Sequence, residues 1–197
     1  MRKFLKIFSI TISTIILLTI FGIGVFLLSY SRWYTEFRDG MLQENLILSD
    51  SSMDETLVKK ISLFTLSEQD TDFLSLTPSE FGHILLSVLD EYLENKVSIE
   101  RVYIEPSLSS WNIYLGMKYR VASVWTMFTL KKDNVQSAQL YVTDIKIGYL
   151  SLPFLIEKIN DGIASGLVVV NENGFSGRYL ENIELLDDKI VIKGSRY

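Results

Sequence analysis

The chain has 197 residues, a formal net charge of −5, no cysteine and one histidine. Without cysteine it has no disulfide framework, thiol nucleophile or cysteine-based zinc site, and one histidine cannot build a multi-histidine metal centre. The acidic balance argues against a nucleic-acid binder, which needs a basic face to neutralise phosphates. The mean hydropathy of +0.22 is high for a soluble domain, because apolar residues are concentrated at the N-terminus.

The first predicted element is an uncharged run of 24 residues, 7–30, preceded by Arg2, Lys3 and Lys6. At about 1.5 Å per residue, a helix of this length covers about 36 Å, which crosses a hydrocarbon core of about 30 Å. The cations before the run favour a cytoplasmic N-terminus and a C-terminal part outside the cytoplasm. The alternative is a cleaved signal peptide, whose apolar region is normally only about 7–15 residues long. Residues 1–31 therefore predict a single-pass anchor in the cell membrane.

The chain after this run carries 16 basic and 24 acidic side chains, a net charge of −8. Its size predicts one domain with its own core, and its acidity disfavours docking on anionic head groups through a basic patch. Residues 32–76 mix charges, polar breaks and short apolar stripes, which predict a stalk with short helices. Ser52 and Glu55 fit a capping box ahead of a helix at residues 53–64. We expect the stalk to be a spacer that holds a domain at residues 77–197 off the membrane.

That domain opens with a helix-start signal, Thr-Pro-Ser-Glu, at residues 77–80. Threonine is a good cap, proline suits the first helical position, and the glutamate can reach back to the cap. Apolar residues then recur at helical spacing, which predicts a helix to about Asn95. This stripe consists of Phe81, Ile84, Leu85, Val88, Leu89 and Tyr92. His83 lies off the stripe, and no hydroxyl or carboxylate constellation marks it as a catalytic base.

Four strands are expected next, because the apolar period changes to two. They are predicted at residues 97–104, 111–119, 121–130 and 135–147. The longest would have about thirteen residues, where five or six are typical. Long antiparallel strands coil, and a coiled antiparallel sheet makes a concave face.

The remaining residues predict a second helix and a terminal hairpin. The helix is expected at residues 154–164, where a Ser-Gly pair ends it, and two or three strands are expected after it, depending on whether the β-branched run 167–170 forms one. Residues 179–186 and 189–193 predict the hairpin. The fold class is therefore α+β: an N-terminal transmembrane helix, then a long-stranded coiled antiparallel sheet packed with two helices.

The search for catalytic motifs gives no candidate enzyme site. There is no G-x-S-x-G nucleophile elbow, glycine-rich phosphate loop or calcium-loop pattern. Asp90-Glu91 and Asp187-Asp188 are adjacent carboxylates, and neighbouring side chains in a helix or strand point apart. The sequence therefore predicts no enzyme, no metal site and no cofactor.

Aromatic and apolar residues are in excess in the predicted sheet, where several strands lack a polar face. One interpretation is a domain core with scattered surface aromatics. The other is a groove between the sheet and its helices that holds an apolar ligand. The candidate ligand-binding residues of this groove are Tyr114, Trp125, Phe128, Leu140 and Val142, with Leu152, Pro153 and Phe154 at its mouth.

Three phrases carry a resemblance to a known family. L-T-P-S-E-F at residues 76–81 precedes the first helix, V-T-D-I-K-I-G-Y-L-S-L-P at residues 142–153 leads into the second, and residues 183–194 form the closing hairpin. Over about residues 73–194, the chain resembles the extracytoplasmic domains of YpmS-type proteins and, more distantly, LmeA-like and other tubular lipid-binding (TULIP-like) domains. The resemblance implies a half-barrel and an anchored, lipid-binding envelope protein. It carries over no residue with a chemical role.

Together these patterns favour a non-enzymatic module at the outer face of the cell membrane that binds a lipid or another apolar ligand. The alternative is a structural or regulatory subunit that contacts an envelope protein complex through the same sheet and stalk. A hydrolase is the third option, with His83 as its one candidate base. No nucleic-acid partner is expected.

Overall fold

The computed structural model describes residues 2–43, 46–48, 54–92, 97–120, 122–133, 135–172 and 178–196. Its helices are α1 (Arg2–Gln43), α2 (Glu55–Leu66), α3 (Pro78–Tyr92), the 3-10 turn η1 (Pro153–Leu155) and α4 (Ile156–Glu172). Its strands are β1 (Ile47–Leu48), β2 (Thr71–Leu76), β3 (Ser98–Ser107), β4 (Ser110–Tyr119), β5 (Ala122–Lys131), β6 (Tyr141–Ile147), β7 (Leu150–Ser151), β8 (Arg178–Leu185) and β9 (Ile190–Arg196). The fold class is α+β, as the sequence predicts.

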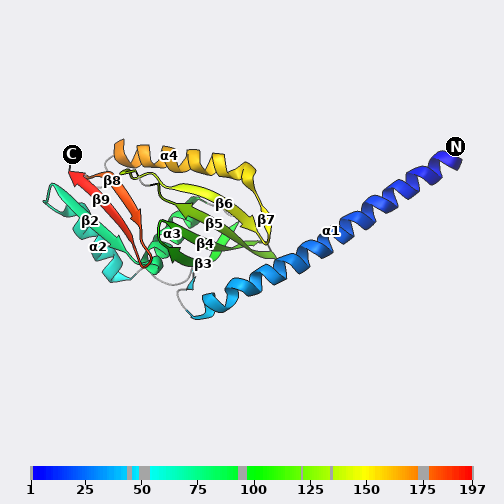
Figure 1. Cartoon of the computed structure of the whole chain (residues 1–197), viewed down its shortest axis with the longest axis horizontal. Helices are drawn as coiled ribbons and strands as arrows, with labels where there is room; N and C mark the ends of the chain where they lie inside the picture. The colour runs from blue at the N-terminus through cyan, green and yellow to red at the C-terminus, as the bar shows by residue number, and fades with distance from the viewer. Residues whose placement is uncertain are drawn as a thin grey trace.

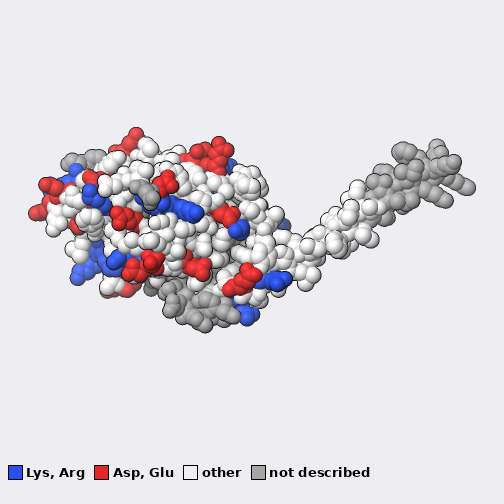
Figure 2. Space-filling model, viewed as in Figure 1, with Lys and Arg blue, Asp and Glu red and all other residues white. Residues whose placement is uncertain are grey.

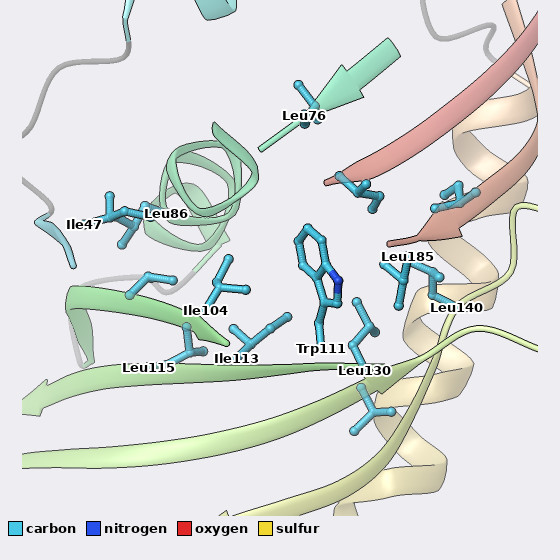
Figure 3. Close-up of a cluster of buried hydrophobic side chains, with 14 of the residues drawn as sticks. Ile47, Leu76, Leu86, Ile104, Trp111, Ile113, Leu115, Leu130, Leu140 and Leu185 are labelled. Carbon is cyan, nitrogen blue, oxygen red and sulfur yellow. The ribbon is translucent and has the colours of Figure 1, made fainter. Parts of the chain in front are cut away.

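The strands form two antiparallel sheets. The larger has the order β1-β3-β4-β5-β6-β7, and the smaller has the order β2-β9-β8. The main core lies between the inner face of the large sheet, the small sheet, α3 and α4 (Figure 1). Trp111 of β4 stands at its centre, with Leu76 of β2 and Leu185 of β8 nearby (Figure 3). The Trp111 indole nitrogen donates a 2.8 Å hydrogen bond to the carbonyl oxygen of Leu186, so this buried polar group is satisfied.

The central strands agree with the alternation in the sequence. Trp111, Ile113 and Leu115 of β4 point into the main core, while Tyr114 belongs to a second cluster on the outer face of the sheet. β3, β4 and β5 have ten residues each, so three of the strands are indeed long. Because both faces are covered, the absence of a polar face reflects a sheet buried on two sides.

The uncharged N-terminal run is part of one continuous helix of 42 residues, α1. The stretch Thr14–Arg38 is long and apolar enough to cross a membrane, a property that signal sequences near an N-terminus share. This half of α1 projects away from the domain, and its described side chains show no Lys, Arg, Asp or Glu before Arg32 (Figures 1 and 2). The structure therefore agrees with the predicted spanning helix in length and composition.

The C-terminal half of α1 packs on the outer face of the large sheet. Trp33, Phe37 and Met41 are buried there at a spacing of four residues, which puts them on one side of the helix. They contact an aromatic and methionine surface made of Tyr103, Tyr114, Trp125 and Met127. The ring centroids of Phe37 and Tyr114 lie 4.5 Å apart. The helix is therefore held to the domain by side-chain packing as well as by the chain itself.

The interpretation of residues 32–76 as a spacer is wrong. β1 pairs with β3, and β2 pairs with β9 along its whole length. Leu57 and Phe64 of α2 and Leu74 of β2 are buried in the main core. The expected boundary at residue 77 does not separate two bodies, because the segment before it supplies strands and core side chains to both sheets.

The two predicted helix starts have different outcomes. At α3 the capping box is confirmed: the Glu80 amide donates to Thr77 Oγ1 at 3.2 Å, and the Thr77 amide donates to Glu80 Oε2 at 2.8 Å. At α2 the cap is Asp54, whose carboxylate accepts from the Thr56 amide at 3.2 Å. Ser52, the cap expected from the sequence, lies outside the described residues.

Two strand predictions are wrong. Residues 135–140 are irregular, so β6 has seven residues instead of about thirteen. Ala138 and Leu140 are nevertheless buried, and the Ser137 amide donates to the Asn182 side chain at 3.1 Å, so tertiary contacts replace strand pairing. Residues 167–170, the β-branched run considered as a further strand, belong to α4.

The helix continues there because its apolar residues keep a helical spacing on the core side. These residues are Ile156, Ile159, Ile163 and Leu167. Burial of that face outweighs the β-branched preference of the sequence and the roughly 1 kcal/mol cost of Gly166 in a helix.

α4 also joins the two sheets through two asparagines. The Asn160 side chain accepts from the Val142 amide at 2.7 Å and donates to the Val142 carbonyl at 3.0 Å. The Asn171 side chain makes the same pair of bonds to Leu180, at 2.9 and 3.4 Å. Each carboxamide therefore satisfies backbone groups of β6 or β8 as a neighbouring strand would.

The start of α3 provides a pH-dependent prediction. Burial alone raises the pKa of the Glu80 carboxyl, but hydrogen bonds from Lys60 and Thr77 outweigh burial and hold this pKa below its ordinary value. The Lys60–Glu80 pair, 2.6 Å long, joins α2 to α3. Its stabilisation is present above the unfolded carboxyl pKa of about 4.3 and is lost as the pH falls through the folded value.

We expect Glu80→Gln to reduce this pH dependence while keeping the cap, since glutamine also fits a capping box. Between pH 6 and pH 3 the unchanged chain should lose about 0.5 kcal/mol more free energy of unfolding than the variant, the size of a partly exposed ion pair. Urea unfolding followed by circular dichroism measures the free energy of unfolding of the unchanged chain and of the variant at each pH. Equal losses would contradict the prediction.

Candidate functional site

An apolar pocket lies between the small sheet and the helices around it. It has a volume of about 200 Å³, is partly open to solvent, and has no polar lining. Its walls come from α2, β2, α3, α4, β8 and β9: Ile61, Phe64, Leu74, Leu76, Phe81, Ile84, Val170, Leu180 and Ile192. An engineered apolar cavity of about 150 Å³ binds benzene, and whole-ligand pockets usually have about 300–1,000 Å³. The pocket therefore has room for a short apolar group or part of an acyl chain.

Most of these side chains face the pocket because they recur at the spacing of a helix or a strand. Ile61 and Phe64 lie three residues apart on α2, and so do Phe81 and Ile84 on α3. Leu74 and Leu76 lie two apart on β2 and share one face of that strand. Six of the nine lining residues thus come from short regular patterns.

Polar contacts at two points hold the pocket walls in place. The Lys60–Glu80 ion pair joins the helices that carry Ile61 and Phe81. The Asn171 bonds to Leu180 fix the end of α4 that carries Val170 against β8. The rim is therefore held by polar side chains while the interior stays apolar, an arrangement suited to excluding water from a hydrocarbon group.

The ligand-binding residues predicted from the sequence are divided between two faces of the large sheet. Tyr114 and Trp125 lie on the outer face beneath α1. On the inner side, the main core includes Phe128, Leu140, Val142 and Leu152. Pro153 and Phe154 are exposed in η1, directly before α4. The structure does not bring the eight side chains together, and none of them lines the apolar pocket.

Tyr114 shows what its face of the sheet does instead. Burial and the neighbouring Glu105 carboxylate raise the pKa of the Tyr114 phenol. The phenol donates to Glu105 Oε2 at 3.3 Å, and its ring is stacked on Phe37 of α1. Tyr114 is thus a packing residue of the contact between α1 and the sheet.

Some of the pocket-lining residues belong to apolar patterns that were visible in the sequence. Phe81 and Ile84 belong to the predicted stripe of α3, and Ile61 and Phe64 lie on one face of the predicted short helix. What sequence reasoning missed was that the segment before residue 77 packs against α3. Once α2 and β2 are placed in the core, these stripes become opposite walls of one space.

In the described part of the chain, no three or more His, Asp or Glu side chains are grouped to hold a metal ion. His83 is half-buried on α3. A cleft of about 220 Å³ with a mixed polar and apolar lining lies at the β3–β4 turn, where Lys132, Asp133 and Glu184 are among the lining residues. Burial lowers the pKa of the Lys132 amine.

Comparisons with protein-family models, with curated proteins and with solved structures find no match to the chain. The class defined by the structure is an α+β domain of antiparallel sheets and helices, with one long apolar N-terminal helix.

Proposed function

We propose that this chain is a membrane-anchored, non-enzymatic module outside the cytoplasm that binds a lipid or another apolar ligand. The observation that carries the proposal is the pocket of about 200 Å³ with a wholly apolar lining. Water finds no hydrogen-bond partners in such a space, whereas moving hydrocarbon from water into it contributes about 0.8 kcal/mol per methylene group. The residue phrases similar to YpmS-type and TULIP-like domains support the same class of ligand.

The membrane anchorage rests on α1. Arg2, Lys3 and Lys6 before the uncharged run favour a cytoplasmic N-terminus, which puts the domain on the outer side. A retained anchor is favoured over a cleaved signal because α1 continues unbroken to Gln43 and its residues Trp33 and Phe37 are buried against the sheet. The apolar run is also longer than a signal peptide requires.

The pocket position limits the form of the ligand. The elements α2, β2, β8 and β9 lie at the end of the domain opposite to the projecting half of α1 (Figure 1). A bilayer crossed by α1 would therefore not touch the pocket. The ligand is accordingly a lipid already withdrawn from the bilayer, or the apolar group of a larger conjugate presented from outside.

Photo-crosslinking tests the proposal with a matched pair of variants. The full chain in nanodiscs is incubated with a diazirine-labelled medium-chain fatty acid, irradiated, digested and mapped by mass spectrometry. We expect crosslinks on pocket residues such as Ile84 and Ile192. Val170→Trp, which fills the pocket, should reduce them at least several-fold. Val169→Trp should leave them unchanged, because Val169 is exposed on the same helix.

Crosslinks that ignore the Val170 substitution, or that are absent from the pocket residues, would overturn the proposal. Native mass spectrometry of the purified full chain provides a second readout. A bound lipid that is retained by the Val169 variant and lost from the Val170 variant supports the same site.

The alternative function, a structural or regulatory subunit of an envelope complex, is favoured by one separate observation. Leu108 and Val135 are exposed large apolar residues that line the cleft at the β3–β4 turn together with charged side chains. Such a mixed surface is typical of a protein contact. Loss of a partner on Leu108→Asp, with fatty-acid crosslinking unchanged, would support this function instead.

A further inference from the structure

A second apolar surface lies where α1 leaves the domain. The turn between β6 and β7 lies at this corner, and η1 follows β7 on the way to α4 (Figure 1). Its exposed large side chains are Tyr149, Leu150 and Phe154; Leu150 is 54% exposed and Phe154 is 73% exposed. Exposed large apolar side chains that gather at one corner mark a contact surface more often than singly scattered ones do.

Specific contacts fix this corner to α1. Gly148, in the β6–β7 turn, has φ +65°, and a Cβ there would lie 3.3 Å from the Tyr30 Cα. The Trp125 amide donates to the Tyr30 hydroxyl at 2.7 Å. Tyr149 donates through its hydroxyl to the Glu36 carboxylate. The turn is therefore held against the helix between Tyr30 and Glu36.

These contacts set the height of the corner relative to a bilayer. Tyr30 closes the 24-residue segment 7–30, and Arg32, after the uncharged Ser31, is the first charge beyond it. About 20 apolar residues cross a hydrocarbon core, so the end of this run lies at the head-group level. Tyrosine is enriched at that level. Because α1 is continuous to Gln43, no linker separates the corner from the membrane surface.

We propose that the corner of Tyr149, Leu150 and Phe154 inserts into the surface of the same bilayer that α1 crosses. The inference rests on the membrane span of the proposed function and is independent of the ligand pocket. The part of the chain after residue 30 has a net charge of −8, so the contact is apolar rather than an attraction to anionic lipid. A domain with two contacts to the bilayer, a span and a corner, has one fixed orientation, with its pocket facing away from the membrane.

Site-directed spin labelling tests this inference directly, since the chain has no native cysteine. Single cysteines replace Leu150 and Phe154 in the full chain, in nanodiscs of phosphatidylcholine with phosphatidylglycerol. Matched controls replace Leu108 and Val135, which are 64% and 66% exposed at the opposite end of the large sheet. Phe21, 68% exposed within the span, is the reference for lipid. The measurement compares collisions of each label with oxygen and with a water-soluble nickel chelate.

We expect the oxygen-to-nickel collision ratio at positions 150 and 154 to exceed that at positions 108 and 135 several-fold, in both low and high salt. Ratios at 150 and 154 that equal the controls, while position 21 reports lipid, would overturn the corner contact and leave the span standing. Shielding of 150 and 154 from both reagents would indicate a protein partner and also overturn it. A low oxygen-to-nickel collision ratio at position 21 would show that this residue lies in water, and it would overturn the membrane span itself.

Discussion

A chain that lacks residues 31–76 is expected not to fold. The deletion removes β2, which pairs with β9 over six residue positions, and the buried side chains of Leu57, Phe64 and Leu74. Loss of a single buried phenylalanine typically costs about 3–5 kcal/mol, and whole domains are stable by only about 5–15 kcal/mol. Circular dichroism and thermal melting of the detergent-solubilised chain should therefore show no cooperative transition.

Deletion of residues 1–28 is the matched control for this experiment. The described side chains in that segment lie outside the domain, and Tyr30, which contacts Trp125 and Gly148, is retained. This shorter chain should keep its cooperative melting transition. A cooperative transition in the chain without residues 31–76 would show that residues 32–76 are a spacer after all.

Replacement of Arg178 by methionine should cost about 3 kcal/mol or more. Arg178 is buried at the start of β8, and its guanidinium donates to the carbonyl oxygens of Ser67, Gln69 and Gly194 at 2.8–3.1 Å. It also lies over the Phe64 ring, 5.3 Å from the centroid. Each buried carbonyl left without a donor costs about 1–3 kcal/mol, and methionine supplies none.

Thermal unfolding tests this prediction, with the same substitution at a nearby exposed arginine, Arg196, as the control. For a chain of this size about 1 kcal/mol shifts the melting temperature by roughly 2–4 °C, so Arg178→Met should lower it by about 6–12 °C. Arg196→Met should change it little, because the exposed Arg196 guanidinium makes a weak bond of 3.4 Å to the Glu68 carbonyl, and its backbone bond to Asp70 is kept in the variant. Similar shifts for the two variants would show that the buried hydrogen bonds add nothing specific.

The sequence alone determined the features that depend on neighbouring residues. The capping box at Thr77 and Glu80 works because its two hydrogen bonds form within four residues. The alternation in β4 follows from the pleat, which puts Trp111 and Tyr114 on opposite faces whatever covers them. The length of the uncharged run likewise predicts a spanning helix without reference to the rest of the fold.

The tertiary structure decided which element covers each apolar face. Tyr114 and Trp125 were candidates for a ligand groove, and they are covered by Trp33 and Phe37 of α1. A local period shows that a face is apolar, but burial against a helix about 80 to 90 residues earlier in the chain and burial against a ligand produce the same pattern.

The same reason explains the errors in residues 32–76 and in α4. Short apolar stripes such as Ile61 and Phe64 indicate that a helix face is buried but not which element covers it. At residues 167–170, the burial of α4 against two sheets outweighs the strand preference of the β-branched residues. The hydrophobic effect is non-directional and depends on the apolar area removed from water, so it does not specify which segment covers a given apolar face. The positions of the pocket and of the corner beside α1 therefore emerge only when distant segments are packed together.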